Sequence, residues 1–162
     1  MVVTLPASGL PRAALHGLIE AYPFKPYRQY RSYSRREQHA ILVADVEATL
    51  AARGEFSHSA GGDEPRAAAI ARPLEWDSAY FGLPMGRIDY LLTTGEATVA
   101  DRRAVITAAC ESARQAGLQH LTARVDVGDL ETLAALEDAG FRMMDALSTY
   151  IMRPGKDVPR DV

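Results

Sequence analysis

Apolar residues recur at helical spacing in two segments of the first third of the chain. Between Pro11 and Pro23 they return every three or four positions, which predicts a short helix that begins after Pro11. A second run, from about Arg35 to Arg53, has the same spacing, and Gly54 provides a stop. The apolar positions of these two predicted helices are Ala14, Leu15, Leu18, Ile19, Ile41, Leu42, Val46 and Leu50.

The middle of the chain changes to short apolar or alternating runs. FSHSAGGDEP, residues 56–65, predicts an exposed loop because glycine, serine and acidic residues dominate it. RAAAIARPLEW and PMGRIDYLL predict two strands, with Pro73 near an edge or a bulge. The DSAYFGL segment between them predicts a turn.

The last third alternates helical and extended patterns. Asp101 predicts the cap of a helix through Ala116, and Asp129 the start of another that Gly140 closes. HLTARV between them and FRMMDALSTYIM after them predict strands, and the tail after Arg153 is typical of a linker. This order of elements predicts an α/β fold in which helices flank a mixed sheet.

Composition narrows the class of protein. A length of 162 residues favours one compact domain, and a net charge of −3 excludes a generally polycationic surface. The lone Cys110 excludes an internal disulfide framework and favours a reducing compartment, so we expect the cytoplasm. We expect a soluble protein without membrane contact, because the first twenty residues lack a leader pattern and no apolar run is long enough to span a bilayer.

Several kinds of catalytic or binding site have no support in the sequence. The dinucleotide fingerprint, the P-loop, the serine-hydrolase elbow and the zincin motif are all missing. Four histidines are scattered over different predicted elements, so we expect no metal site. Cys110 lies on the apolar side of its predicted helix and is expected to be a small buried hydrophobe.

A tyrosine- and arginine-rich connection follows the first predicted helix. No acid occurs between Glu20 and Glu37, so Arg28, Arg31 and Arg35 are candidates for binding an anion. The alternative is a prolyl connection that lays its rings on the core and leaves its arginines in water. We favour that alternative, and with it little affinity for nucleic acid.

The aromatic segment WDSAYFG also allows two interpretations. It can be a structural turn in which an Asp-Ser pair binds backbone amides and large rings are buried on either side. Or it can be a platform on which a ring stacks beside Asp77, which would accept hydroxyl or ammonium protons. The candidate substrate-binding residues are Trp76, Asp77, Ser78, Tyr80 and Phe81.

Two segments resemble a known family. LEWDSAYFG is similar to the opening motif of bacterial dTDP-fucosamine acetyltransferase and its relatives in the GNAT N-acetyltransferase superfamily. The stretch LTARVDVGDLETLAALEDAGFRMMDALSTY resembles the strand, helix and Ala-Gly-Phe return of the same family. The resemblance covers roughly residues 66–153. It implies a GNAT-like sheet and acetyl-CoA-dependent acetylation of an amine, in those relatives an amino group of a nucleotide-linked sugar.

The chain departs from that family where the chemistry is concentrated. The expected glycine-containing pyrophosphate loop is missing before the Asp101 helix, where TTGEATVAD also carries two acids. Alignment on Gly140 and Phe141 places Asp129 where catalytic members often carry an asparagine, and Leu136 where they carry a proton-donating tyrosine. These departures predict that the chain does not catalyse alone.

Together these inferences predict three parts. Residues 1–65 form a helical extension with the Tyr/Arg-rich connection and an exposed loop, residues 66–153 a GNAT-like domain, and residues 154–162 a linker-like tail. The expected function is that of an N-acetyltransferase domain that meets an amino sugar or another small-molecule amine, with acetyl-CoA bound by this chain or by a partner acetyltransferase domain. The alternative is a non-catalytic interaction module that uses the Tyr/Arg-rich segment, and a homo-oligomer is compatible with both.

Overall fold

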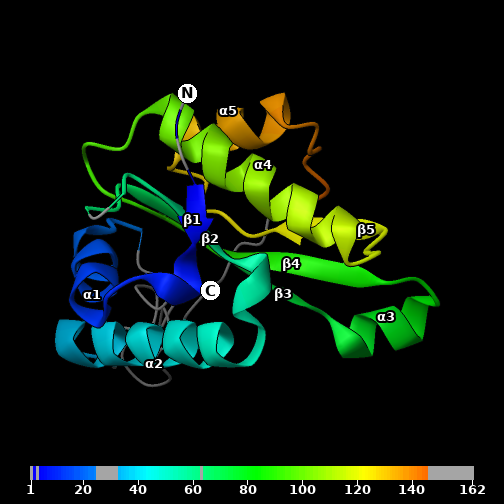
Figure 1. Ribbon diagram of the computed structural model, residues 1–162, viewed down its shortest axis with the longest axis horizontal. Coiled ribbons are helices and arrows are strands. Elements are labelled where there is room, and N and C mark those ends of the chain that lie inside the picture. Colours follow the sequence, from blue (N-terminus) through cyan, green and yellow to red (C-terminus); the bar gives the residue numbers. More distant parts are fainter. Residues whose placement is uncertain (1, 3, 25–32, 63, 146–162) are drawn as a thin grey trace, which may run out of the picture.

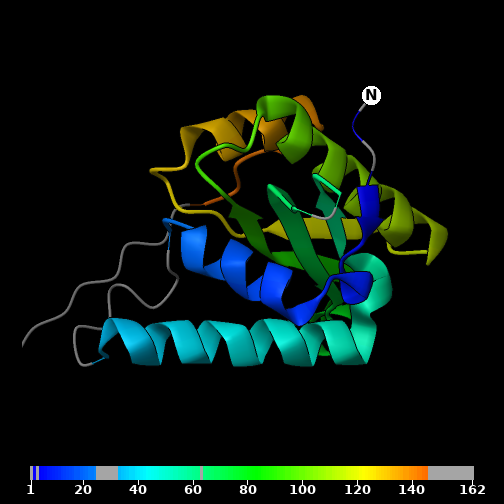
Figure 2. The same ribbon diagram turned by 60° about the vertical axis from the view of Figure 1, so that its left-hand side comes forward.

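The protein contains one mixed five-stranded sheet between two layers of helices (Figures 1 and 2). The computed structural model describes residues 2, 4–24, 33–62 and 64–145. Its strands are β1 (Thr4–Pro6), β2 (His58–Ala60), β3 (Ala67–Pro73), β4 (Met85–Thr93) and β5 (His120–Ala123). Its α-helices are α1 (Arg12–Ala21), α2 (Arg35–Arg53), α3 (Glu75–Phe81), α4 (Val99–Gln115) and α5 (Leu130–Asp138), with short 3-10 helices at Ala7–Gly9 and Gly54–Phe56.

The strands follow one another across the sheet in chain order. Neighbours from β1 to β4 are antiparallel, and β5 is parallel to β4. The helix α4 makes the crossover between those two parallel strands. The expected mixed α/β sheet with flanking helices is therefore confirmed.

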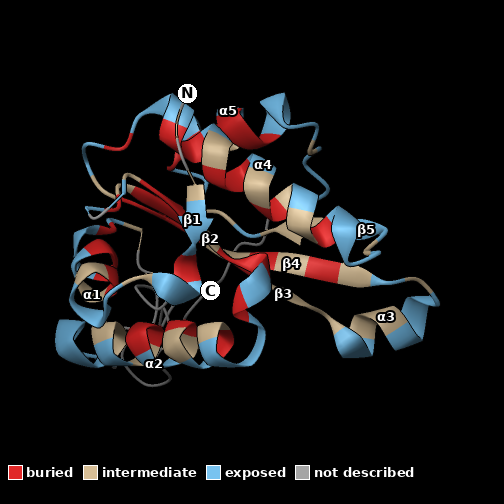
Figure 3. Ribbon diagram, in the orientation of Figure 1, coloured by how far each residue is buried: buried red, intermediate tan, exposed pale blue. Residues whose placement is uncertain are grey.

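Each face of the sheet has its own core. Helices α1 and α2 pack on one face against Ala68, Ile70 and Leu92, whereas α4 and α5 cover the other face against Ala67, Ala69 and Ile88 (Figure 2). Alternation along β3 sends successive residues to opposite cores. Figure 3 shows the resulting buried stripe through the middle of the molecule.

The two predicted amino-terminal helices are confirmed, and each has a clear local cause. Helix α1 begins directly after Pro11 and ends before Pro23. Helix α2 begins with a capping box in which the Ser34 hydroxyl accepts from the Glu37 amide while the Glu37 carboxylate accepts from the Ser34 amide. Residues 4–60 also supply β1 and β2, so the segment expected to be a helical extension forms part of the same sheet.

The prediction of an exposed loop over residues 56–65 is wrong for its first half. Residues 58–60 form β2, between β1 and β3, and Phe56 and Ala60 are buried. Ser57 looked polar but is buried, because its hydroxyl accepts from the Ala71 amide at 3.0 Å and donates to the Ala71 carbonyl at 3.3 Å. A serine that binds a neighbouring strand in this way breaks the apolar pattern without leaving the core.

The segment predicted to be a turn between β3 and β4 is largely the helix α3. Gly82, with a φ of 70°, ends this helix in the left-handed conformation, and its amide donates to the Ser78 carbonyl. Pro73 lies at the end of β3, beyond the part that pairs with β2, so its missing amide leaves no ladder bond unmade. Pro73 was expected near an edge or a bulge, and it lies where β3 has lost its pairing with β2, two residues beyond the register shift at Ile70 and Ala71.

Two further boundaries differ from expectation. Thr98, not Asp101, is the cap of α4, and Asp101 is the third residue of its first turn. Residues 141–145 of the last predicted strand have no strand geometry, and the remainder of that strand and the tail lie outside the described residues. Within the described part of the chain, no helix combines the length and apolar composition of a membrane span.

Candidate functional site

The strands β4 and β5 separate halfway along β4. They are paired from Met85 opposite His120 to Ile88 opposite Ala123, and the Arg124 amide makes the last contact with the Ile88 carbonyl at 3.2 Å. Beyond it β4 continues to Thr93, while the chain after β5 leaves for α5. The described residues therefore offer no strand partner to the β5-facing edge of residues 89–93, and backbone groups there can receive an extended ligand.

A β-bulge lies at this same point. Ala71 pairs with Ile88 and Ile70 pairs with Tyr90, so Asp89 is an extra residue in β4. Its side chain, 7% exposed, forms ion pairs with Arg72 of β3, at 2.6 Å, and with Arg87 of β4. The bulge thus fixes two guanidinium groups where β4 leaves β5.

The amino terminus of α4 follows the free end of β4. The Thr98 hydroxyl accepts from the Asp101 amide at 3.1 Å, and an Asp101 oxygen accepts from the Thr98 amide at 3.0 Å. The amides of Val99 and Ala100 have no hydrogen-bond partner among the described residues, and both residues are exposed. Free amides at the start of a long helix favour an anion.

The acid in this first turn is not a repulsive surface charge. Asp101 is fully buried, and Arg66 donates to both of its oxygens, from Nε at 3.0 Å and from a terminal nitrogen at 2.9 Å. Hydrogen bonds from Arg66 and Thr98 hold the pKa of this carboxyl far below its usual range, although burial opposes them. Of the two acids that were expected to oppose a pyrophosphate here, Asp101 is therefore compensated within the protein, whereas Glu96 is exposed.

The loop between β5 and α5 forms the opposite side of the divergence. Asp129 is buried and caps α5 by accepting from the Thr132 amide at 3.1 Å. Tyr22, at the end of α1, is buried with its ring 5.9 Å from that of Phe24. The Phe24 ring would lie 3.4 Å from a Cβ placed on Gly128, so the end of α1 packs against this loop.

The Tyr22 phenol is held in its protonated form. Burial raises its pKa most, and the nearby carboxylates of Asp129 and Asp126 raise it further. Its hydroxyl has no hydrogen-bond partner in the part of the chain that the structure describes. Leu136, by contrast, is buried in the core beneath α4.

The aromatic candidates lie at the other end of β4, on α3, which projects from the sheet in Figure 1. Trp76 and Tyr80 are each 71% exposed and Phe81 is 58% exposed, so the interpretation of this segment as a turn with buried rings is wrong. Trp76 stacks on Tyr80 with ring centres 5.3 Å apart, and Tyr80 meets Phe81 edge-on. Three adjacent rings are left facing solvent because α3, among the described elements, packs mainly against β4.

The two polar candidates on α3 differ from each other. Ser78 donates to the Leu74 carbonyl at 2.6 Å and accepts from the Met85 amide at 2.8 Å, so its hydroxyl ties α3 to β4. Asp77 is half-buried in the first turn of α3. Of these two side chains, only that of Asp77 has an oxygen without a partner among the described residues, and this oxygen is available to a ligand.

Of the three candidate anion-binding residues in the Tyr/Arg-rich segment, only Arg35 lies among the described residues. Arg28 and Arg31 lie outside the described residues, and Arg35 is exposed at the first position of α2. No group of histidine, cysteine and acidic side chains among the described residues could hold a metal ion. Burial raises the pKa of the Cys110 thiol, in keeping with a protonated side chain.

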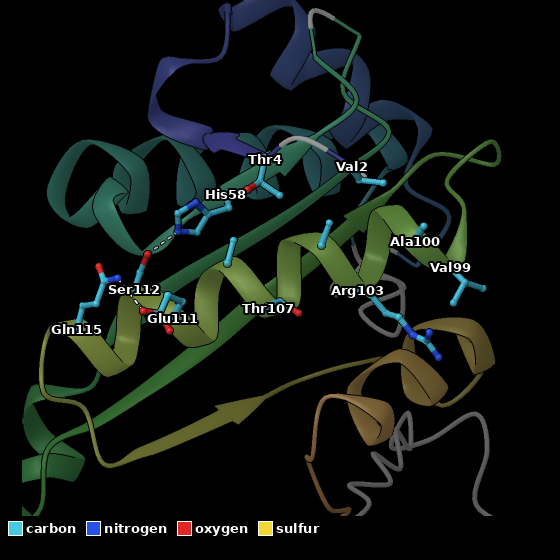
Figure 4. Close-up of a pocket in the computed structure, with 12 residues that line it drawn as sticks. Val2, Thr4, His58, Val99, Ala100, Arg103, Thr107, Glu111, Ser112 and Gln115 are labelled. Atoms are coloured by element: carbon cyan, nitrogen blue, oxygen red, sulfur yellow. Dashed lines mark hydrogen bonds between the residues drawn. The ribbon is translucent and has the colours of Figure 1, made fainter.

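A groove between the edge of the sheet and α4 contains a polar pair that the sequence did not suggest (Figure 4). His58 and Ser112 point toward each other across it, 2.7 Å apart. Burial lowers the pKa of His58, so the imidazole is neutral at pH 7. Ser112 lies within α4, whose backbone amides there bond to the preceding turn, so the helix offers no free amide beside the Ser112 hydroxyl.

Comparisons with known proteins identify the fold. Neither protein-family models nor curated proteins gave a match to the sequence. Among solved structures, a mutant of TTHA1254 from Thermus thermophilus is similar over 93% of this chain and 98% of its own, with 18% identity and a TM-score of 0.63. The NatC complex bound to Gag peptide and CoA is similar over 89% and 86%, with 16% identity and a TM-score of 0.67.

A third similar structure is that of a protein named for its enzymatic activity. The ribosomal-protein-alanine N-acetyltransferase from Brucella melitensis biovar Abortus 2308 is similar over 94% of this chain and 98% of its own, with 15% identity and a TM-score of 0.59. The bulge in β4, the separation of β4 from β5 and the α4 crossover between these two strands are in keeping with the similarity to these solved structures. The chain has the fold of the GNAT N-acetyltransferases.

Proposed function

We propose that this chain is an acetyl-CoA-dependent N-acetyltransferase that acts on a small-molecule amine. The observation that carries the proposal is the bulge at Asp89, where β4 leaves β5 and leads into a helix with two free amides. The fold shared with solved acetyltransferases supports the same reaction class, although fold alone does not fix a function.

The residues at the amino terminus of α4 fit the phosphates of the coenzyme. The amides of Val99 and Ala100 would bind a pyrophosphate, and Arg66, 41% exposed, adds a guanidinium beside them. These groups stand in for the glycine-containing loop that the sequence lacks. When bound, acetyl-CoA would supply an acetyl group activated as a thioester.

The chain's own residues then have distinct tasks. The unpaired edge of β4 beyond Ile88 would orient the extended part of the coenzyme through backbone hydrogen bonds. Tyr22 would donate a proton to the leaving group, the task for which the family resemblance expects a tyrosine at position 136. A phenol whose pKa is raised stays protonated at neutral pH, as a donor must.

Calorimetric titration with acetyl-CoA tests the proposal most directly. We expect saturable binding to the wild-type chain and release of free CoA thiol when an amine is added. Val99→Pro should weaken acetyl-CoA binding about tenfold, because it removes one amide that bonds a charged group. Proline is tolerated here, since Val99 is the first helical residue and Thr98 is already extended, with a ψ of 164°.

Val99→Ala is the matched control for this prediction. It shortens an exposed side chain but keeps the amide, so it should bind acetyl-CoA as the wild type does. Equal acetyl-CoA affinity of Val99→Pro and Val99→Ala would show that the pyrophosphate does not bind at the amino terminus of this helix. A wild-type chain that neither binds acetyl-CoA nor releases thiol would refute the proposed function.

The acceptor that we favour within this proposal is an amino sugar, free or linked to a nucleotide. Its support is the exposed shelf of Trp76, Tyr80 and Phe81, with Asp77 beside it to accept an ammonium or hydroxyl proton. The need for a partner acetyltransferase domain stays a prediction, and a chain that acetylates an amine unaided would remove it.

Trp76→Ala separates a binding role from a structural one. Because the ring is exposed, the free energy of unfolding should change by less than about 0.5 kcal/mol. A platform for the acceptor would raise KM for an amino sugar while leaving kcat close to the wild-type value. Val127→Ala, at another exposed apolar position, is the control, and a loss of stability above about 2 kcal/mol would show that the ring packs.

A further inference from the structure

Arginine side chains from two neighbouring strands, and from the residue that follows a third, face the same side of the sheet near Asp89. On β3, Ala71 belongs to the core under α4, so Arg72 points to the opposite face. On β4, Ile88 packs in that same core, and Arg87 therefore shares the face of Arg72. Arg72 and Arg87 are direct cross-strand partners.

Arg124 joins them from the position directly after β5. Leu121, Ala123 and Val125 pack against the core under α4, so Thr122 and Arg124 between them point to the other face. Thr122 is the cross-strand partner of Arg87, and the Arg124 amide binds the Ile88 carbonyl next to the bulge. We call Arg72, Arg87 and Arg124 the arginine cluster.

Like charges directly across two strands destabilise a sheet, so the cluster requires a compensating charge. Asp89 supplies one, and the ion pairs with Arg72 and Arg87 both use the Nε atoms of the arginines. The terminal nitrogens of these two side chains have no hydrogen-bond or ion-pair partner among the described residues. Two positive charges thus contact one negative charge, and Arg124 adds a third positive charge on the same side of the sheet.

Two other acids, Asp45 and Asp126, are engaged elsewhere. Asp45 accepts from the Tyr90 hydroxyl at 2.5 Å, and Asp126 accepts from the Gly128 amide at 2.8 Å. The helical layer covers this face as far as Ile70 and Tyr90, and in Figure 1 β3 and β4 continue past α2 toward α3. Arg72 is 39% exposed there, so an anion in solution can reach the free guanidinium nitrogens.

We infer that the arginine cluster binds an anionic group, a carboxylate or a phosphate, carried by the acceptor amine. This inference rests on the proposed function. Asp89 is the first residue of β4 beyond the last pair with β5, so an acceptor held by the cluster has its amine beside the diverging strands. Guanidinium forks match carboxylates and phosphates in geometry, and Asp89 fixes two of these forks before the ligand arrives.

Two measurements test the inference, and the first does not depend on activity. The NMR signals of the arginine Nε–H groups are followed during titration of the full chain with inorganic phosphate and, separately, with acetate. Arg72→Gln and Arg124→Gln should each weaken binding of the preferred anion about tenfold or more, because each removes a charged hydrogen-bond donor. Arg124→Gln leaves both Asp89 ion pairs in place, so its effect does not depend on unpairing the buried acid.

Arg114→Gln is the control of equal charge change, since Arg114 pairs with Glu111 on the exposed side of α4. The second measurement compares matched acceptors, phosphoethanolamine with ethanolamine and alanine with alaninamide. We expect kcat/KM to be at least tenfold higher for the anionic member of one pair, which also tells phosphate from carboxylate. That preference should fall in Arg72→Gln and Arg124→Gln but not in Arg114→Gln.

The two measurements distinguish failure of this inference from failure of the proposed function. Acetylation of neutral and anionic amines at equal rates, or anion binding unchanged by both cluster variants, would overturn the inference and leave the proposed function standing. Anion binding at the cluster without acetyl transfer to any amine would support the anion site and overturn the proposed function.

Discussion

Arg66→Ala is expected to lower the free energy of unfolding by about 3 kcal/mol, because it leaves the Asp101 carboxylate buried without its counter-charge. Asp101 is fully buried, and Arg66 donates to both of its oxygens. Breaking a buried ion pair in this way costs about 3–5 kcal/mol, and we expect the lower end because solvent reaches Arg66. The loss should appear in urea unfolding at pH 7.

Arg12→Ala provides the control for this effect. Arg12 also donates to both oxygens of an acid, Glu47, at 2.6 and 3.2 Å, but that pair lies at the surface. Its removal should cost less than about 1 kcal/mol. Equal losses in the two variants would show that the Asp101 pair behaves as a surface pair.

The pH dependence of stability gives a second reading of the same pair. The pKa of Asp101 is lowered in the folded state, so its contribution is complete above the unfolded value of about 4 and disappears as the pH falls through the folded value. The difference in stability between the wild type and Arg66→Ala should therefore shrink below pH 4. A constant difference from pH 7 to pH 3 would contradict this assignment.

The parts of the fold that the sequence predicted correctly are those with a local cause. Helix α2 follows from its apolar spacing and from a capping box within four residues, and β3 and β4 follow from short apolar or alternating runs. The strand β2 was missed because Ser57 reads as a loop residue. Its hydroxyl is satisfied by Ala71, fourteen positions away, and no local pattern encodes that contact.

The interpretation of the aromatic segment as a turn with buried rings was wrong for the opposite reason. Trp76, Tyr80 and Phe81 have the composition of a core, and only the projection of α3 from the sheet leaves them exposed. A composition rule predicts how much area a residue can bury but not whether another element lies over it. The resemblance to the acetyltransferase family located this segment but could not orient its rings.

The site itself depended on strand register. Asp89 stands out in GRIDYLL as an acid within a strand, and that is the signal from which it could have been singled out. The role of Asp89 in the site depends on the bulge, which places it between Arg72 and Arg87, and on the end of the pairing between β4 and β5. The pair of Arg66 and Asp101, 35 positions apart, likewise exists only after β3 and α4 have packed.

The Tyr22 phenol should make the wild-type protein lose stability in alkali. Its pKa is raised by burial and by two carboxylates, so the folded state keeps the proton more tightly than the unfolded state, whose value is about 10. The associated stability is complete below pH 10 and declines as the pH rises above it, by up to about 1.4 kcal/mol per pH unit. Tyr22→Phe has no proton to lose, so its advantage over the wild type should grow at that slope between pH 10 and pH 11.5.

Urea unfolding across this pH range measures the slope, and Tyr80→Phe is the control because the Tyr80 ring is largely exposed. Parallel curves for the wild type and Tyr22→Phe would show that the phenol titrates alike in both states. Below pH 9 the two proteins should be equally stable within about 1 kcal/mol, since the hydroxyl has no described partner to lose.

That equality at neutral pH makes Tyr22→Phe a clean test of proton donation. If Tyr22 protonates the leaving group, kcat should fall about a hundredfold, with acetyl-CoA binding unchanged by calorimetry. An unchanged kcat beside the expected alkaline slope would leave Tyr22 as a packing residue at the end of α1, and the proton would have to come from solvent between the diverging strands. The two measurements separate what burial does to this phenol from what the phenol does in the reaction.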